Sequence, residues 1–178
     1  MRLFKTHDME ATKPDLPGFT RMASDLMDRL RDIKRKDFQN AAWISPIPYP
    51  EELPSLINSD GLTVPVQMLT SDIEKFTFDE NTMDLIIICG RLDTVNDLPG
   101  VLVQIRRALK PDGLFMCALP GGETLHELRD SLSRVELQRR GGVAPRVHPM
   151  IDLQTWAGLL QRAGFALPVA DSMIVPVS

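Results

Sequence analysis

The sequence predicts an α/β fold with a mostly parallel β-sheet and helices on both faces. Two runs carry this prediction, DLIIIC (84–89) and LFMCAL (114–119), because both are almost wholly apolar, like strands that are covered on both faces. The stretch between them has apolar residues at helical spacing, so the chain alternates strand, helix and strand. Such a connection is right-handed and joins parallel strands. We therefore expect NAAWIS (40–45) and these two runs to be neighbouring central strands of one parallel sheet.

The length and composition of the chain indicate one globular domain. Of its 178 residues, 43% are hydrophobic and 25% are charged, which is ordinary for a protein with a sizeable core. We expect an N-terminal arm over residues 1–18 and a single, partly truncated domain over residues 19–178. The formal net charge of -4 gives no general attraction to nucleic acid, so nucleic acid is not an expected partner.

Neither a membrane span nor a secretory signal is expected. No apolar run approaches the roughly 20 residues that cross a bilayer. The N-terminus lacks the apolar centre and the cleavage site of a signal peptide. Cys89 and Cys117 lie in apolar, strand-like runs without metal-ligand spacing, so we expect buried, reduced thiols and a cytoplasmic location.

The remaining elements follow from periodicity and turn residues. Helices are expected at about residues 19–36, 97–109, 124–139 and 152–163, and the segment 50–58 allows a short one. NAAWIS (40–45) and LTVPVQMLT (62–70) are strand-like, and Pro65 suggests an edge or an entrance to the second strand. FALPVADSMIVPV (165–177) predicts one or two last strands.

Local signals suggest how several of these elements begin. Asn96 or Asp97 and, later, Asp152 are candidate helix caps. Thr124 and Glu127 have the spacing of a capping box. KPDG (110–113) predicts a turn in which the glycine takes the positive φ.

Three stretches of the chain resemble a known family. FDENTMDLIII, VNDLPGVLVQIRRALKPDGLFMCALPGGETLHELR and LLQRAGF are similar to the second half of a class I S-adenosylmethionine-dependent methyltransferase. The longer run resembles most the branch that includes the mitochondrial complex I assembly factor and its alphaproteobacterial relatives. More distantly, it resembles the malonyl-carrier-protein methyltransferase of biotin synthesis. The resemblance implies a shortened Rossmann-like class I methyltransferase fold, with S-adenosylmethionine as the cofactor.

One expected feature of that family is missing from the sequence. In the family, the first strand ends in a glycine-rich loop whose backbone approaches the methionine part of the cofactor, and an acid after the second strand holds the ribose. The corresponding stretch, AAWISPIPYPEEL (41–53), contains no glycine, and its prolines lack amide donors. The ribose-binding acid has no obvious counterpart, and the only guesses are Glu51, Glu52 and Asp60.

The resemblance still implies the other rim of a cofactor site. Asp72 corresponds to the acid that reaches the adenine amino group, with Ile73 against the ring. Cys89, Gly90 and Arg91 resemble the segment that lines the methionine end. The simpler interpretation of Asp72 is an exposed carboxylate in a turn. For Arg91 it is a guanidinium on the protein surface, and the alternative is that Arg91 projects into the vacated cofactor pocket.

Few residues offer acid–base chemistry. His126 and His148 are candidate proton acceptors because imidazole titrates near neutrality, although a structural or surface role is the simpler interpretation of each. The sequence shows no Ser/His/Asp set, no paired carboxylates at a telling spacing and no metal-binding cluster.

Two functions therefore stay open. The resemblance implies a methyltransferase that uses S-adenosylmethionine on a protein or small molecule. The missing glycines favour a non-catalytic relative instead, a pseudoenzyme that acts as a binding module or an assembly factor, for example for a respiratory complex, with room for a protein partner. In that case protein should fill the vacated pocket, with Trp43 or Tyr49 as the side chains best placed. A nicotinamide-binding protein is disfavoured because no G-x-G-x-x-G follows a strand.

Overall fold

The computed structural model describes residues 17–34, 37–48, 50–57, 66–69, 73–75, 78–144, 146 and 150–175. The predicted arm lies almost wholly outside the described residues, as do Tyr49, Asp60, Pro65, Asp72 and His148.

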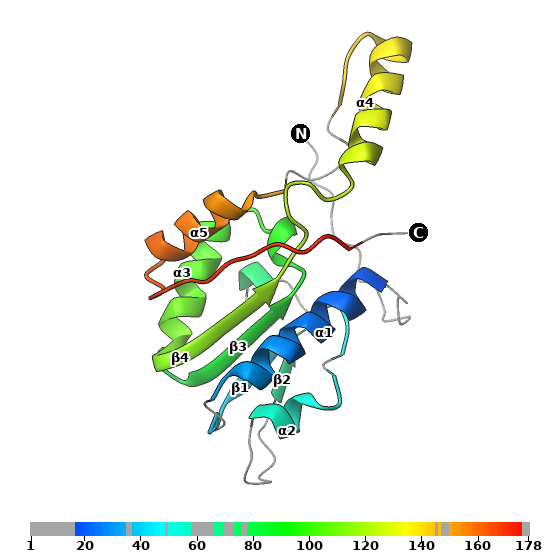
Figure 1. The fold of residues 1–178 in the computed structure, drawn as a ribbon. Coiled ribbons are helices and arrows are strands. Elements are labelled where there is room, and N and C mark those ends of the chain that lie inside the picture. Colours follow the sequence, from blue (N-terminus) through cyan, green and yellow to red (C-terminus); the bar gives the residue numbers. More distant parts are fainter. Residues whose placement is uncertain are drawn as a thin grey trace.

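The described part of the chain forms one parallel sheet of four strands in the order β2-β1-β3-β4 (Figure 1). The strands are β1 (Ala41–Ile44), β2 (Val66–Leu69), β3 (Met83–Cys89) and β4 (Leu109–Ala118). The predicted neighbours β1, β3 and β4 are confirmed, and so is their parallel direction. However, β4 is the edge strand of this sheet, not a central one as predicted.

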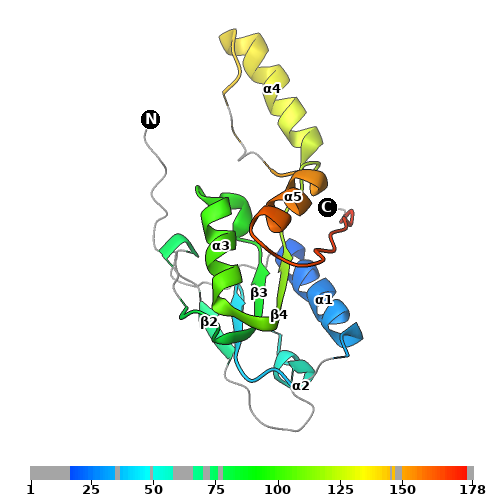
Figure 2. The same cartoon turned by 90° about the vertical axis from the view of Figure 1, so that its left-hand side faces the viewer.

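Helices cover both faces of the sheet, as the sequence predicts (Figures 1 and 2). On one face lie α1 (Pro17–Asp32) and α2 (Leu53–Ile57), and on the other lie α3 (Leu98–Ala108) and α5 (Leu153–Arg162). Successive strand side chains alternate between the faces, so β3 contributes to both cores. Leu85 and Ile87 pack with α1 and α2, whereas Ile86 and Ile88 pack with α3 and α5.

The helix ends agree only partly with the sequence signals. Asp97 caps α3 by accepting from Gly100 N at 3.0 Å, and Asp152 caps α5 by accepting from Thr155 N at 2.9 Å. The predicted capping box is wrong, because α4 (His126–Arg140) begins after Leu125, which has a φ of 53° and makes no side-chain cap. The left-handed backbone at Leu125 turns the chain into the helix without the side-chain hydrogen bonds of a box. The helix predicted at 19–36 already ends at Asp32.

Two predictions around the last strands are also wrong. β4 begins at Leu109 and runs through KPDG, and the positive φ falls on Asp112 (62°) instead of Gly113. Met83 pairs with Leu109 and Leu85 with Leu114, so β4 has extra residues between these two pairs. KPDG lies in this irregularity of the strand, which is found where the turn was expected. Residues 165–175 form no strand, since an apolar pattern becomes a strand only where its backbone pairs with a sheet.

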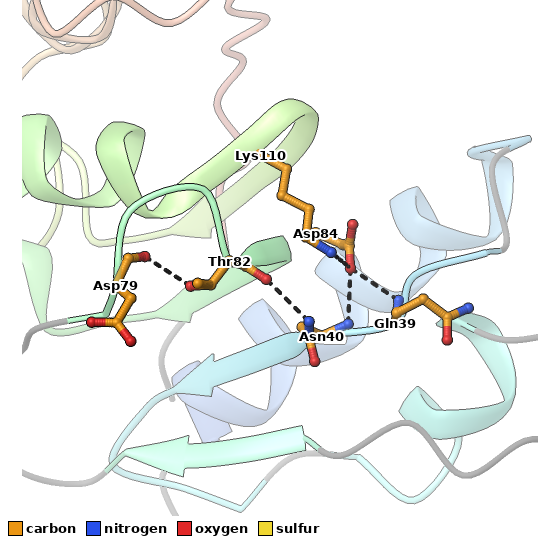
Figure 3. A network of polar contacts seen from close by, with 6 residues as sticks. All are labelled: Gln39, Asn40, Asp79, Thr82, Asp84 and Lys110. Atoms are coloured by element: carbon orange, nitrogen blue, oxygen red, sulfur yellow. Dashed lines mark hydrogen bonds and ion pairs between the residues drawn. The ribbon is translucent and has the colours of Figure 1, made fainter.

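A buried carboxylate on β3 connects three segments at the start of the sheet (Figure 3). Asp84 Oδ2 accepts from Gln39 N at 3.1 Å, from Asn40 N at 2.9 Å and from Lys110 Nζ at 2.9 Å. Asn40 Nδ2 in turn donates to Thr82 O at 3.1 Å. Burial alone raises the pKa of Asp84, but Lys110 and the two amides outweigh it and hold the pKa below its ordinary value.

We expect Asp84→Ala to lower the free energy of unfolding by about 2–4 kcal/mol, because two buried amides and a partly buried ammonium lose their acceptor. The lowered pKa means that the carboxylate stabilises the fold near neutral pH, and that this contribution is lost as the pH falls below the ordinary Asp value of about 3.9. Urea unfolding at neutral and acidic pH measures both effects. Asp130→Ala, on the exposed side of α4, is the matched control, and an equal loss in both variants would contradict the prediction.

Candidate functional site

The carboxyl ends of the parallel strands meet at one edge of the sheet, which is where open α/β sheets bind ligands. Ile44, Cys89 and Ala118 end β1, β3 and β4 at this edge. The structure therefore brings the predicted site residues Cys89, Gly90 and Arg91 beside the segment that follows β1. Their role in cofactor binding stays a prediction.

The segment after β1 folds back onto the strand that precedes it. Ser45 is fully buried, and its Oγ accepts from Ile47 N at 3.2 Å. Trp43 Nε1 donates to Ile47 O at 3.0 Å, so both backbone polar groups of Ile47 are engaged within the protein. Trp43 itself is fully buried in the core with α1 and α2, and its hydrogen bond to Ile47 O connects that core to the turn.

The first turn of α1 covers the end of β3. Gly90 has a φ of 71°, and a Cβ atom placed there would lie 2.3 Å from Cε1 of Phe19. Cys89 Sγ lies 3.7 Å from Phe19 O, which places the backbone of the helix at the same point. The ring of Phe19 thus occupies the space directly against Gly90. Sequence reasoning missed this contact, because Phe19 was only the first member of a helical stripe and lies 71 positions before Gly90.

Arg91 continues the unusual backbone that begins at Gly90. Its φ is 74°, which is strained for a side chain of this size, and it leads into a short 3-10 helix, η2 (Leu92–Thr94). Thr94 Oγ1 donates back to Arg91 O at 3.0 Å and closes this turn. Arg91 as a whole residue is half-buried, and its projection into a cofactor pocket stays a prediction.

Ile73 belongs to the core on the α3 face of the sheet. It begins the 3-10 helix η1 (Ile73–Lys75) and is buried with Val95 and Leu98. Glu74 fixes this short helix to the start of α3, because its carboxylate accepts from Asp97 N at 3.3 Å and also from Asn96 N. The contact of Ile73 with an adenine ring stays a prediction, and its partner Asp72 lies outside the described residues.

The two thiols lie on neighbouring strands but on opposite faces. Cys89 is paired in register with Ala118, and Cys117 with Ile88, so each points into a different core. Both cysteines are free, as predicted, but only Cys89 is buried, and the prediction of a buried residue is wrong for Cys117, which is half-buried on the edge strand. Burial raises the pKa of Cys89 to about 11, against a hydrogen bond with Ser45, and it raises the pKa of Cys117 to about 12.

No acid–base pair gathers at the strand edge in the described part of the chain. His126 opens α4 and is exposed, with its Nδ1 3.1 Å from Glu123 O. Among the described residues, no group of three or more His, Cys, Asp or Glu side chains could hold a metal ion. None of the described helices is long and apolar enough to cross a membrane.

Comparison with known proteins agrees with this architecture. A family model described as a methyltransferase domain matches residues 18–168. The chain belongs to the methyltransferase domain family. Its fold is that of S-adenosylmethionine-dependent methyltransferases, as a solved complex of a putative methyltransferase with its Trm112 activator from Haloferax volcanii illustrates. That structure matches with a TM-score of 0.54 and 16% identity, over 90% of this chain and 76% of the other.

Curated relatives confirm both resemblances that the sequence suggested. The chain is 44% identical over 117 residues to "Arginine-hydroxylase NDUFAF5, mitochondrial" of Danio rerio, which covers 66% of this chain and 36% of the relative. It is 32% identical over 104 residues to malonyl-[acyl-carrier protein] O-methyltransferase of Laribacter hongkongensis, which covers 58% of this chain and 33% of the relative. This methyltransferase-like chain therefore spans about a third of the length of these relatives.

The family implies S-adenosylmethionine, but the described residues do not fit it. The backbone groups of Ile47 that could face a ligand bind Ser45 and Trp43 instead. At the end of β3, the ring of Phe19 lies so close to Gly90 that even a methyl group placed on Gly90 would collide with it. In the described residues, the turn after β1 and the ring of Phe19 thus lie at the two strand ends where the family binds the methionine part of its cofactor.

The contact between Phe19 and Gly90 predicts a measurable coupling. Gly90→Ala should lower the free energy of unfolding by about 1–3 kcal/mol, because alanine is strained at positive φ and its methyl group displaces the ring of Phe19. In a Phe19→Ala background the same change should cost only the backbone part, about 1 kcal/mol. A double-mutant cycle by urea unfolding measures the difference, and identical losses in both backgrounds would refute the contact.

The raised thiol pKa values predict slow chemistry at both cysteines. At pH 8, the pKa of about 11 for Cys89 leaves about one thiolate in a thousand, and Cys117 has fewer still. We expect iodoacetamide to leave the folded protein unmodified and to label both thiols once urea unfolds it, as read by intact mass. Fast labelling of folded protein, or a mass showing a disulfide, would contradict this prediction.

Proposed function

We propose that this chain is a non-catalytic member of its family, a methyltransferase-fold module that binds a protein partner and acts in assembly. The observation that carries the proposal is the filled edge of the sheet, where the turn at Ser45–Ile47 and the ring of Phe19 take the place of a cofactor cradle. The parallel sheet of the described residues lies beneath that edge, so the chain still offers a folded body to a partner.

Hydrogen-bond chemistry gives the size of the loss. Pro46, Pro48 and Pro50 have no amide hydrogen to donate to a carboxylate, and Ile47 N–H is already bound to Ser45. A hydrogen bond to a charged group contributes about 1.5–3 kcal/mol, so losing two or three of them weakens binding by several orders of magnitude. A total loss of about 4 kcal/mol would move a micromolar cofactor affinity to the millimolar range.

The direct test is calorimetric titration of the purified chain with S-adenosylmethionine. We expect no saturable heat up to about 1 mM, which corresponds to about 4 kcal/mol of binding free energy. Phe19→Ala is the informative variant, because it clears the space above Gly90 and leaves the proline turn unchanged. Micromolar affinity in the native chain would overturn the proposal. Micromolar affinity in Phe19→Ala alone would also overturn it, since the ring would then act as a gate over a working site.

A second candidate function comes from the relatives. The 44% identity to the Danio rerio arginine hydroxylase favours an action on arginine in a protein substrate. An arginine peptide that gained the mass of one oxygen atom during aerobic incubation with the chain in cell lysate, and not in lysate alone, would support this candidate over the first. Neither the cofactor titration nor the peptide incubation tests a role in respiratory complex assembly or a cytoplasmic location. Both stay predictions.

A further inference from the structure

Residues 165–175, which we name the strap, follow α5 and run across β4 toward α1 (Figures 1 and 2). The strap begins on the face of the sheet that α3 and α5 cover. There the ring centroids of Phe165 and of Phe115 on β4 are 5.1 Å apart, and Phe165 N donates to Leu160 O at 3.1 Å. Ala170 packs against the core of the same face. The first half of the strap is therefore fixed to the α5 side of the sheet.

One residue later, the strap reaches the helix on the opposite face. Asp171 Oδ2 lies 3.0 Å from Nη2 of Arg29, which belongs to α1. Because α1 contacts β4 and β4 is the edge strand of the described sheet, the strap passes from one layer of helices to the other at this strand. It thus connects the two layers outside the sheet.

The strap makes few other contacts. Three of its apolar side chains are almost fully exposed, Leu167 (92%), Val169 (91%) and Ile174 (94%). Within the described part of the chain, residues 166–175 form no backbone hydrogen bond, although they cross an edge strand. The attachment of the strap to α1 therefore depends on the ion pair between Asp171 and Arg29.

Arg29 binds two carboxylates at once. Its Nε donates to Asp25 Oδ2 at 2.7 Å within α1, and its Nη2 donates to Asp171 Oδ2. The hydrogen bonds to these carboxylates, first Asp25 and then Asp171, raise the pKa of Arg29 above its ordinary value. Asp25 thus holds the guanidinium in place on the helix, and the guanidinium in turn holds the strap.

The helix that the strap contacts also carries Phe19. α1 is one continuous helix, and Phe19 lies ten residues before Arg29, which is about 15 Å along the helix axis. An attachment at Arg29 therefore limits how far the first turn of α1 can move as part of a rigid helix. That turn covers Gly90 with its ring and Cys89 with its backbone, so both residues are uncovered when it moves away.

We propose that the strap controls access to the end of β3: by pairing with Arg29 it holds α1 on the sheet and keeps Phe19 over Gly90. When the ion pair breaks, the first turn of α1 leaves this edge more often. The side chains of Arg29 and Asp171 are 42% and 61% exposed, so the pair shifts the balance between covered and uncovered states by a small factor. The inference concerns how the edge is covered, so it does not depend on whether the chain is an enzyme.

The two thiols provide a reporter and an internal control. Cys89 lies beneath Phe19, whereas Cys117 points into the core of the other face. The full chain is treated with methyl methanethiosulfonate, a small thiol reagent, and peptide mapping by mass spectrometry gives the labelling rate of each cysteine. Asp171→Asn should label Cys89 about two- to fivefold faster than the native chain. Asp171→Arg should accelerate it further, because it places two cations together, and Cys117 should keep its native rate in both variants.

Glu80→Gln is the matched control. Glu80 is also 61% exposed and forms an ion pair with Arg107 of α3, so this variant makes the same change of charge far from the strap. It should leave the labelling rate of Cys89 unchanged. An unchanged rate in both Asp171 variants would overturn the proposal. Equal acceleration of the two thiols would also overturn it, because that result indicates a general loss of stability, and so would a Glu80→Gln variant that labels as fast as Asp171→Asn.

Discussion

The carboxylate of Asp84 connects the beginnings of β1, β3 and β4, and the order of the sheet depends on this contact. A buried charge is tolerated only with close partners, and here Gln39 N, Asn40 N and Lys110 Nζ supply them. Gln39 and Asn40 directly precede β1, and Lys110 lies in β4, so the contact fixes where β1 and β4 start relative to the central strand. The seven buried residues of β3 then align with both neighbours, and the two cores form on its alternate side chains.

The two ends of the sheet have different consequences for function. The end with Asp84 is a closed polar network, whereas the opposite end is where a methyltransferase of this fold would receive its cofactor. At that end, Trp43 holds the turn after β1, and Phe19 lies on Gly90. The fold of the family is therefore present, and these two contacts are what support the proposed loss of cofactor binding.

Helix α4 extends from the same end of the sheet, beyond β4. Its apolar side chains Leu128, Leu132, Val135 and Leu137 are exposed and pack against no other part of the described chain. An exposed helix of this kind is consistent with the proposed role in binding a protein partner.

The sequence by itself determined the parallel α/β sheet, the family and the absence of a glycine loop. Apolar runs such as LIII and a proline-rich turn are local patterns, and local patterns report burial and backbone geometry directly. Tertiary structure alone decided what fills the vacated edge, because Phe19 and Gly90 are joined only when α1 packs on β3. It also decided that Asp112 takes the left-handed turn, that residues 165–175 pair with no strand, and that Thr124 and Glu127 form no box. In each case the sequence pattern is compatible with a turn, strand or cap, but whether it forms depends on the backbone and side chains that it meets in the folded protein.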